Sequence, residues 1–262
     1  MAATNTHPSF VLESASMQFK STLALDEINL TIERGDRVAL IGPSGSGKST
    51  LLKLLNASLA PTSGSVLIHG KSTTGLTPKD LRKLRTTIGW IPQSLGVIDN
   101  LTVLQNIVLG GVGSQSLAST LRKLTFPSRA DRLRVLEHLE RVGIGQKLFE
   151  RTSSLSGGQQ QRVAIARTLF QNPQSILADE PVSSVDPARA EDLVDLLTTL
   201  ADSHNATLVM SLHNLELAKR FFPRVIGLRK GHVVIDKPGS ALTEADTQTL
   251  YDLSAEELTA DA

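Results

Sequence analysis

The amino-acid sequence predicts an α/β fold with an inserted helical lobe. A short apolar run, residues 37–41, leads into a glycine-rich loop, and a helix-like run, residues 50–55, follows that loop. After residue 175, strand-like runs again alternate with helix-like ones, as in folds that pack helices on a sheet. Residues 94–154 lack strand-like runs and show amphipathic helical spacing instead. We therefore expect a sheet-containing core interrupted by a helical segment.

Composition excludes several classes of protein. The chain has 262 residues, of which 40% are hydrophobic and 20% charged, as in ordinary globular proteins. The net charge of +1 predicts neither a nucleic acid nor an anionic membrane surface as a partner. The chain contains no cysteine, which excludes disulfides and fits a reducing compartment. Residues 1–8 do not resemble a signal peptide, and no apolar run is long enough to span a membrane.

The glycine-rich loop has the pattern of a phosphate-binding P-loop. Its residues are Gly42, Pro43, Ser44, Gly45, Ser46, Gly47, Lys48 and Ser49, and Thr50 continues it into the helix. The glycines let successive backbone N–H groups converge on one anion, and the helix N-terminus adds the positive end of its dipole. We expect Lys48 to reach the β- and γ-phosphates and the Ser49 hydroxyl to bind Mg²⁺. A mere glycine-rich turn would not require the Lys-Ser pair or both flanks, so we predict a nucleoside triphosphate site.

A carboxylate pair, Asp179 and Glu180, follows the apolar strand-like run 175–178. Asp179 is suited to hold Mg²⁺ through its water shell. Glu180 is suited to polarise an attacking water or to accept its proton. Adjacent acids at a strand end can also be solvated turn residues, but the P-loop upstream favours a role at the phosphates.

Three further side chains lie where predicted strands end. Gln93 fits either a polar loop position or a carboxamide that contacts the metal and the attacking water. A lone histidine such as His213 is commonly structural, but ligands bind at the carboxyl ends of strands in open α/β sheets. Phe19 fits equally a core position and a position stacked on a nucleotide base.

A second possible anion site lies at the start of a helix that runs to about Phe170. The helix opens with Ser156, Gly157, Gly158 and Gln159. Ser156 is a favourable N-cap, and the two glycines would let a phosphate approach the backbone closely. A start of this kind is by itself more often only a helix cap.

These motifs occur in the order found in the ATPases of ABC transporters, and Leu-Ser-Gly-Gly-Gln at residues 155–159 resembles the signature of that family. The resemblance covers about residues 10–235. It implies a P-loop NTPase (RecA-like) core with an antiparallel β subdomain and an inserted α-helical subdomain. The implied division is a core of residues 1–92 and 159–236, a helical subdomain of residues 93–158 and a polar C-terminal tail of residues 237–262.

The resemblance also implies roles for single residues. Phe19 would stack on adenine, although tyrosine is usual there, and Gln93 would link Mg²⁺ and the attacking water to the helical lobe. Glu180 would be the catalytic base. Asp186 would be the aspartate of the D-loop, and His213 would contact the γ-phosphate.

Partners follow from the same resemblance. In this family, the P-loop and the signature that share one ATP come from different subunits, and residues 156–159 would bind the γ-phosphate across that interface. We therefore expect an ATP-dependent homodimer, peripheral at the cytoplasmic face of the inner membrane. It would dock on integral-membrane permease subunits and act indirectly with a solute-binding protein, but not with nucleic acid.

The transported solute depends on a finer resemblance. Residues 100–113, the segment onward to Ser128, and residues 139–144, 155–167 and 231–236 look like those of phosphonate-importer ATPases. That likeness implies uptake of phosphonate, phosphite or a related phosphorus oxyanion. The alternatives are ATPases of amino-acid importers and of lipoprotein or cell-division complexes. A soluble ABC ATPase acting on nucleic acid would carry two cassettes or a coiled-coil insertion, and a P-loop kinase would not need the signature helix.

Overall fold

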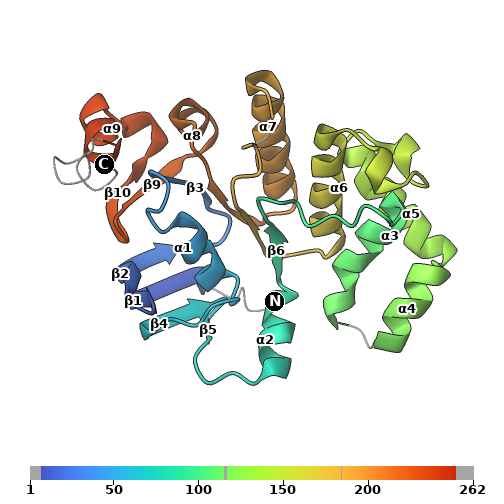
Figure 1. Ribbon diagram of the computed structural model, residues 1–262, viewed down its shortest axis with the longest axis horizontal. Coiled ribbons are helices and arrows are strands. Elements are labelled where there is room, and N and C mark those ends of the chain that lie inside the picture. Colours follow the sequence, from blue (N-terminus) through green and yellow to red (C-terminus); the bar gives the residue numbers. More distant parts are fainter. Residues whose placement is uncertain (1–6, 115–116, 184, 252–262) are drawn as a thin grey trace, which may run out of the picture.

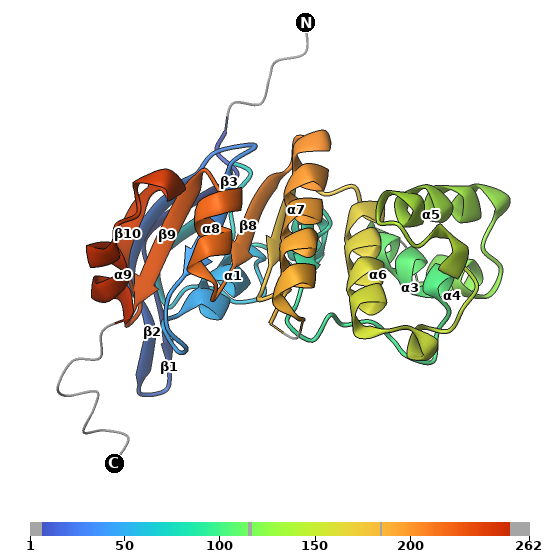
Figure 2. The same ribbon diagram turned by 90° about the horizontal axis from the view of Figure 1, so that it is seen from above.

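Two β-sheets and a lobe of helices make up the computed structural model, which describes residues 7–114, 117–183 and 185–251 (Figure 1). One sheet has six strands and the other has four. The helical lobe lies at one end of the molecule, and the C-terminal helix lies at the other end (Figure 2). This arrangement confirms the predicted α/β fold with an inserted helical part.

The six-stranded sheet carries the polar strand ends. Its spatial order is β10-β9-β3-β8-β7-β6. The strands are β3 (Arg37–Ile41), β6 (Ile88–Ile91), β7 (Ser175–Ala178), β8 (Thr207–Ser211), β9 (Arg224–Arg229) and β10 (His232–Pro238). All run parallel except β10, which pairs antiparallel with β9 in the predicted hairpin. Because β3, β6, β7 and β8 are parallel, their carboxyl ends meet along one edge of the sheet.

The four-stranded sheet is antiparallel, in the order β2-β1-β4-β5. Its strands are β1 (Phe10–Phe19), β2 (Thr22–Ile32), β4 (Ser63–Ile68) and β5 (Lys71–Ser72). β2 begins earlier than the predicted run of residues 28–32, because a turn at Lys20 with a φ of 51° returns the chain directly into pairing. Helix α2 (Pro78–Arg85) then leads back to the six-stranded sheet.

Helices cover both faces of the six-stranded sheet. Alternate residues along each strand face opposite sides, so Val209 packs with α1 (Lys48–Leu55), whereas Leu208 packs with α7 (Pro187–Ser203) and α8 (Leu215–Phe221). The sequence did not indicate α8. Its seven residues are too few for an apolar periodicity to stand out. The side chain of Asn214 nevertheless caps the helix by accepting hydrogen bonds from the N–H groups of Glu216 and Leu217.

The helical lobe joins the core through α6 (Gly157–Phe170). The lobe's other elements are α3 (Val103–Val108), η1 (Leu109–Ser114), α4 (Leu117–Thr125), α5 (Arg129–Arg141), η2 (Gly145–Lys147) and η3 (Thr152–Ser154). α6 packs against α3 and α5 on one side and against β6 on the other. The predicted subdomain boundary after residue 158 therefore falls within the first turn of α6. The predicted loop around residues 110–119 ends sooner than expected, since α4 begins at Leu117.

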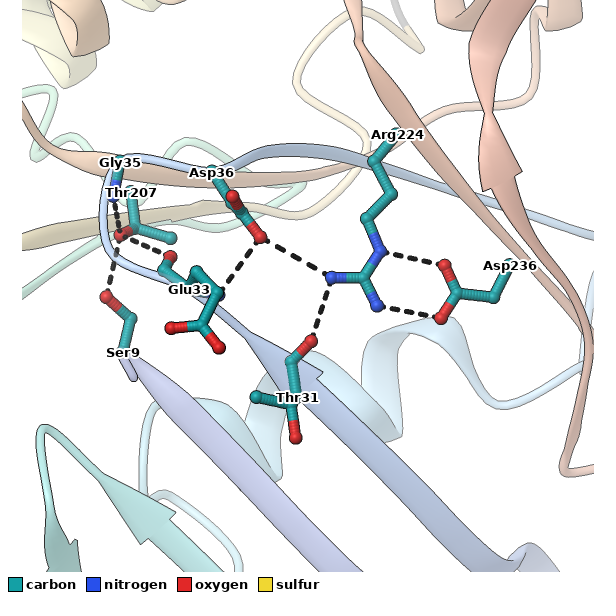
Figure 3. A network of polar contacts seen from close by, with 8 residues as sticks. All are labelled: Ser9, Thr31, Glu33, Gly35, Asp36, Thr207, Arg224 and Asp236. Carbon is teal, nitrogen blue, oxygen red and sulfur yellow. Dashed lines mark hydrogen bonds and ion pairs between the residues drawn. The ribbon is translucent and has the colours of Figure 1, made fainter. Parts of the chain in front are cut away.

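A polar network fixes the connection between the two sheets (Figure 3). Arg224 donates two hydrogen bonds of 2.7 Å to the carboxylate of Asp236 and a third, of 2.8 Å, to the carbonyl of Thr31 at the end of β2. It also lies 3.4 Å from Asp36. The hydrogen bonds from Arg224 to Asp236 are the main cause of its raised pKa. One guanidinium thus ties β9, β10 and the β2–β3 connection together.

The residues expected to be a polar tail are partly folded. After β10, helix α9 (Glu244–Tyr251) packs near β9, and its Leu250 is fully buried in the core. Lys237 forms an ion pair of 2.7 Å with Asp246, which holds α9 against the end of β10. The composition suggested a tail because most side chains of this helix are polar. Its contacts with the core are made by Leu250, which is buried, and by Tyr251, which is partly buried. Residues 252–262 lie outside the described part.

Histidine burial in the lobe predicts acid sensitivity. His138 on α5 is buried edge-on against Phe170, and this burial lowers its pKa from 6.5 to about 4. Because the folded state disfavours the protonated ring, its contribution to stability is complete above pH 6.5 and is lost as the pH falls toward 4. We expect the free energy of unfolding to fall by about 1 kcal/mol per pH unit in that window.

His138→Leu should remove part of this pH dependence, measured by urea unfolding at several pH values between 6.5 and 4. Part should remain, because burial also lowers the pKa of His69 to about 4. Equal losses of stability in the variant and the parent would contradict the prediction.

Candidate functional site

The loop between β3 and α1 has a backbone that only glycine permits at two positions. Gly42 has a φ of 149°, and Gly47, the N-cap of α1, has a φ of 108°. A Cβ on Gly42 would lie 2.2 Å from the carbonyl oxygen of Leu228, and one on Gly47 would lie 2.7 Å from that of Ala24. The neighbouring strands therefore enclose the loop, and its N–H groups and the α1 N-terminus share one concave side.

Lys48 is buried inside this loop. Its ammonium donates hydrogen bonds of 2.8 Å to the carbonyl of Gly42 and of 3.0 Å to that of Pro43. Burial lowers the pKa of Lys48, and the nearby carboxylates of Glu180 and Asp179 partly offset this effect. A cation enclosed by a loop whose backbone N–H groups can also donate is suited to bind a polyphosphate.

Two serines hold the first carboxylate of the strand-end pair. Ser49 from α1 and Ser211 from the end of β8 both donate to Oδ1 of Asp179, at 3.0 Å and 2.9 Å. Ser211 Oγ also accepts a 2.8 Å hydrogen bond from the backbone N–H of Glu180. A buried hydroxyl therefore fixes both the side chain of Asp179 and the backbone of Glu180.

Glu180 lies between the two other predicted polar residues. Its Oε1 is 2.6 Å from Nε2 of His213, and its Oε2 accepts a 3.2 Å hydrogen bond from Nε2 of Gln93. Its backbone has a φ of 46°, a left-handed conformation that is costly for a residue with a side chain. Strain of this kind is often found at functional sites, and here it directs the carboxylate between Gln93 and His213.

These residues line one pocket of about 330 Å³. Its walls are Ala24, residues 44–50, Gln93, Glu180 and His213. The residues that sequence reasoning placed at the P-loop and at three strand ends therefore come together. The Ser49–Asp179 pair fits Mg²⁺, which in triphosphate sites takes few protein ligands and binds mainly phosphates and water. Within the described residues, no cluster of three acidic or histidine side chains offers a separate metal site.

The helix start at residues 156–159 lies outside that pocket. Ser156 and Gln159 form a capping box, in which Gln159 accepts a 3.0 Å bond from the N–H of Ser156. Gly157 and Gly158 line a different pocket, of about 430 Å³, together with Gln93 and Asp186. None of Ser156, Gly157, Gly158 and Gln159 lines the P-loop pocket, whereas Gln93 borders both pockets.

Two residues that the sequence assigns to nucleotide binding, Phe19 and Asp186, lie outside the P-loop pocket. Phe19 ends β1 with 43% of its surface exposed, which excludes the alternative of a core position. It does not line the pocket at the P-loop, so base stacking stays a prediction. Asp186 caps α7 by accepting a 3.1 Å bond from the N–H of Arg189, and it also pairs with the Arg189 guanidinium.

Sequence reasoning missed two residues of the site. Ser211 was assigned only to a strand, since a serine there gives no signal until β7 and β8 are placed side by side. Burial raises the pKa of Tyr251 on α9, and the nearby backbone of Gly42 opposes this rise, although the hydroxyl makes no hydrogen bond within the described residues. No pattern in the polar C-terminal segment linked it to the P-loop.

Residues 25–183 match the family described as ABC transporter. Two solved structures support the same fold, both of the cassette MJ0796 and both 33% identical to this chain, covering 89% of it. One is a dimeric bacterial ABC transporter cassette with a TM-score of 0.78, and the other is a dimeric post-hydrolysis state bound to ADP and phosphate with a TM-score of 0.77. The chain therefore belongs to the ATP-binding cassettes of ABC transporters.

The curated relatives of the chain include import ATP-binding proteins for phosphonates and for phosphate. The phosphonates import ATP-binding protein PhnC of Frankia casuarinae is 44% identical over 88% of this chain and 90% of its own length. PhnC of Anaeromyxobacter dehalogenans is 48% identical over 94% of this chain, which spans about half of that relative (48%). The phosphate-import ATP-binding protein PhnC of Mycolicibacterium smegmatis is 40% identical over 92% of this chain and 91% of its own length.

The role of Ser211 can be tested by substitution. Ser211→Ala removes both hydrogen bonds that fix Asp179 and Glu180, so we expect kcat for ATP hydrolysis to fall about tenfold or more, with a smaller change in ATP affinity. The matched control is Ser175→Ala on the adjacent strand, where the buried hydroxyl has no partner among the described residues. Equal rates for Ser211→Ala and Ser175→Ala would remove Ser211 from this role.

Proposed function

We propose that this chain is the ATP-hydrolysing subunit of an ABC importer that takes up phosphonate or a related phosphorus oxyanion. The family assignment supports the ATPase, and the names of the relatives support the solute. The observation that carries the catalytic part is the placement of Glu180 between Gln93 and His213, next to Lys48.

The site supports hydrolysis by a positioned base. The P-loop N–H groups and Lys48 bind the β- and γ-phosphates, which holds the γ-phosphorus facing Glu180. Glu180 accepts a proton as water attacks that phosphorus, and the bond to the ADP oxygen breaks. Gln93 and His213 hold the two oxygens of the Glu180 carboxylate, and His213 is placed to reach the γ-phosphate. Ser49 and Asp179, with Gln93 nearby, would hold Mg²⁺, which neutralises charge on the phosphates when bound.

A second copy of the chain completes the site in this proposal. The P-loop pocket lacks the signature residues, of which Gly157 and Gly158 line another pocket on the same chain. The solved neighbours are dimeric cassettes. Residues 156–159 of one copy would bind the γ-phosphate held by the P-loop of the other, with Asp186 at the interface and Phe19 on the adenine.

The chain would work at the cytoplasmic face of the inner membrane, docked on permease subunits. Within the described residues, no helix is long and apolar enough to cross a membrane. Membrane-spanning partners would therefore supply the transport path, and the solute-binding protein would act through them.

Glu180→Gln tests the catalytic base and the dimer together. We expect it to bind ATP but to lower ATP hydrolysis at least a hundredfold, since general base catalysis contributes about 10² or more. Light scattering with MgATP should show a shift from 28.1 kDa to twice that mass. Glu140→Gln, on the exposed face of α5, is the matched control and should keep normal activity. Near-normal hydrolysis by Glu180→Gln would disprove the assigned role.

Ser156→Arg tests the signature. The added side chain would block the approach of a phosphate to the α6 N-terminus, so ATP should still bind the monomer while ATP-driven dimerisation is lost. Ser153→Arg, at an exposed position in η3, should leave dimerisation intact. Normal dimerisation of Ser156→Arg in the Glu180→Gln background would count against a composite site.

The solute is tested by complementation. The gene, supplied with its own permease and binding protein, should restore growth of a phosphonate-uptake mutant on methylphosphonate as the sole phosphorus source. The Glu180→Gln variant should not. Growth rescued on low phosphate but not on methylphosphonate would overturn the phosphonate assignment in favour of phosphate import, as in the mycobacterial relative's name.

A further inference from the structure

The α4–α5 hairpin exposes large apolar side chains at the tip of the helical lobe. Leu121 on α4 is 56% exposed, Phe126 in the connecting turn is 76% exposed, and Leu133 on α5 is 57% exposed. The hairpin lies at the end of the molecule opposite α9 in both views (Figures 1 and 2). The nucleotide pocket uses none of these residues, and Phe126 is more exposed than Phe19 and Phe149, which are also exposed phenylalanines.

The part of this hairpin around its turn is strongly basic, whereas the rest of α5 adds Glu137, Glu140 and Arg141. Residues 117–134 carry five basic side chains, Arg122, Lys123, Arg129, Arg132 and Arg134, and one acidic side chain, Asp131. The whole chain has a net charge of only +1, so its near-neutral composition hides this local excess. Asp131 is occupied by the α5 cap, where its carboxylate accepts bonds from the Ser128 N–H at 3.2 Å and hydroxyl at 2.7 Å.

Three of the cations could meet a partner without breaking an ion pair. Arg122, Arg129 and Arg132 are exposed, and none forms an ion pair with another described residue. Arg134, by contrast, stacks over Phe170 at 4.3 Å and is directed into the lobe. The hairpin thus carries exposed arginines and exposed apolar side chains close together in the sequence.

Two hydrogen bonds fix the conformation of the turn between α4 and α5. The N–H of Phe126 donates a 2.7 Å bond to the carbonyl of Arg122, and Nε of Arg132 donates a 3.2 Å bond to the carbonyl of Pro127. These bonds close the turn from both helices, so Phe126 is presented at the surface before any partner is bound. Little conformational entropy would be lost at the turn on binding.

We infer that the α4–α5 hairpin binds an anionic membrane surface, with Phe126 entering the headgroup region and Arg122, Arg129 and Arg132 contacting lipid phosphates. Its charge is complementary to anionic lipid, and exposed arginines combined with exposed Phe and Leu are the composition of elements that bind membrane surfaces. A lipid surface adapts to separate protruding side chains such as Phe126, whereas a protein partner needs a shaped contact. This inference goes beyond the proposed function and does not depend on ATP hydrolysis.

Vesicle sedimentation of the full chain tests it. The protein should sediment with phosphatidylcholine vesicles that contain phosphatidylglycerol, should bind much less to phosphatidylcholine alone, and should be released by salt. Replacing Arg122, Arg129 and Arg132 together by Gln should weaken binding at least about fivefold for each cation removed. The matched control replaces the exposed Lys20, Lys53 and Lys71 by Gln, which makes the same charge change on the core.

The apolar contribution is tested separately. Phe126→Ser should weaken binding to anionic vesicles several-fold, whereas Phe149→Ser should not, although Phe149 is also an exposed phenylalanine of the lobe, at 67%. All variants should keep the parent's ATPase rate, which shows that they fold. Equal binding by parent, triple-Gln and control proteins would overturn the inference.

A depth measurement separates lipid insertion from simple charge attraction. In a Trp90→Phe background, Phe126→Trp places the only tryptophan at the hairpin tip. Bromine-labelled lipids should quench its fluorescence if the side chain enters the bilayer surface. Absence of quenching, or tight binding to polyglutamate with no binding to anionic vesicles, would overturn the inference and favour an acidic protein partner.

Discussion

Burial of α1 between the two sheets is the constraint on which the nucleotide site depends. Leu51, Leu52, Leu54 and Leu55 are all fully buried, with the four-stranded sheet on one side and the six-stranded sheet on the other. The helix therefore cannot shift, and its N-terminus, Lys48 and Ser49 are fixed relative to the strand ends. The network around Arg224 strengthens this arrangement by tying the sheet connection to β9 and β10.

Parallel register explains why distant residues meet. Ala178 pairs with Ile91 on one side and with Met210 on the other, and Leu40 pairs with Ser211. The strands therefore end nearly level, and the residues that follow them form one row at the sheet edge. This is the usual ligand position in open α/β sheets, and it brings Glu180 into contact with both Gln93 and His213.

Much of this was predictable because the signals are local. The P-loop, the Asp179–Glu180 strand end and the Ser156 cap each depend on a few adjacent residues whose backbone chemistry is short-range. Elements with weak local signals were missed or misplaced. Helices α8 and α4 are short or follow a glycine-rich stretch, and α9 is polar apart from Leu250 and Tyr251, so their stability comes from packing that the sequence pattern does not display.

The sequence by itself predicted the fold class, which the structure confirms, and it indicated phosphate chemistry at the P-loop and the strand ends, because periodicity and motif spacing are local signals. Only the tertiary structure decided that Ser211 supports both Asp179 and Glu180, that Tyr251 approaches Gly42, and that Phe19 is exposed. It also revealed that basic and apolar side chains gather on one hairpin of a nearly neutral chain. Contacts between residues far apart in the sequence depend on strand order and packing, which no local pattern specifies.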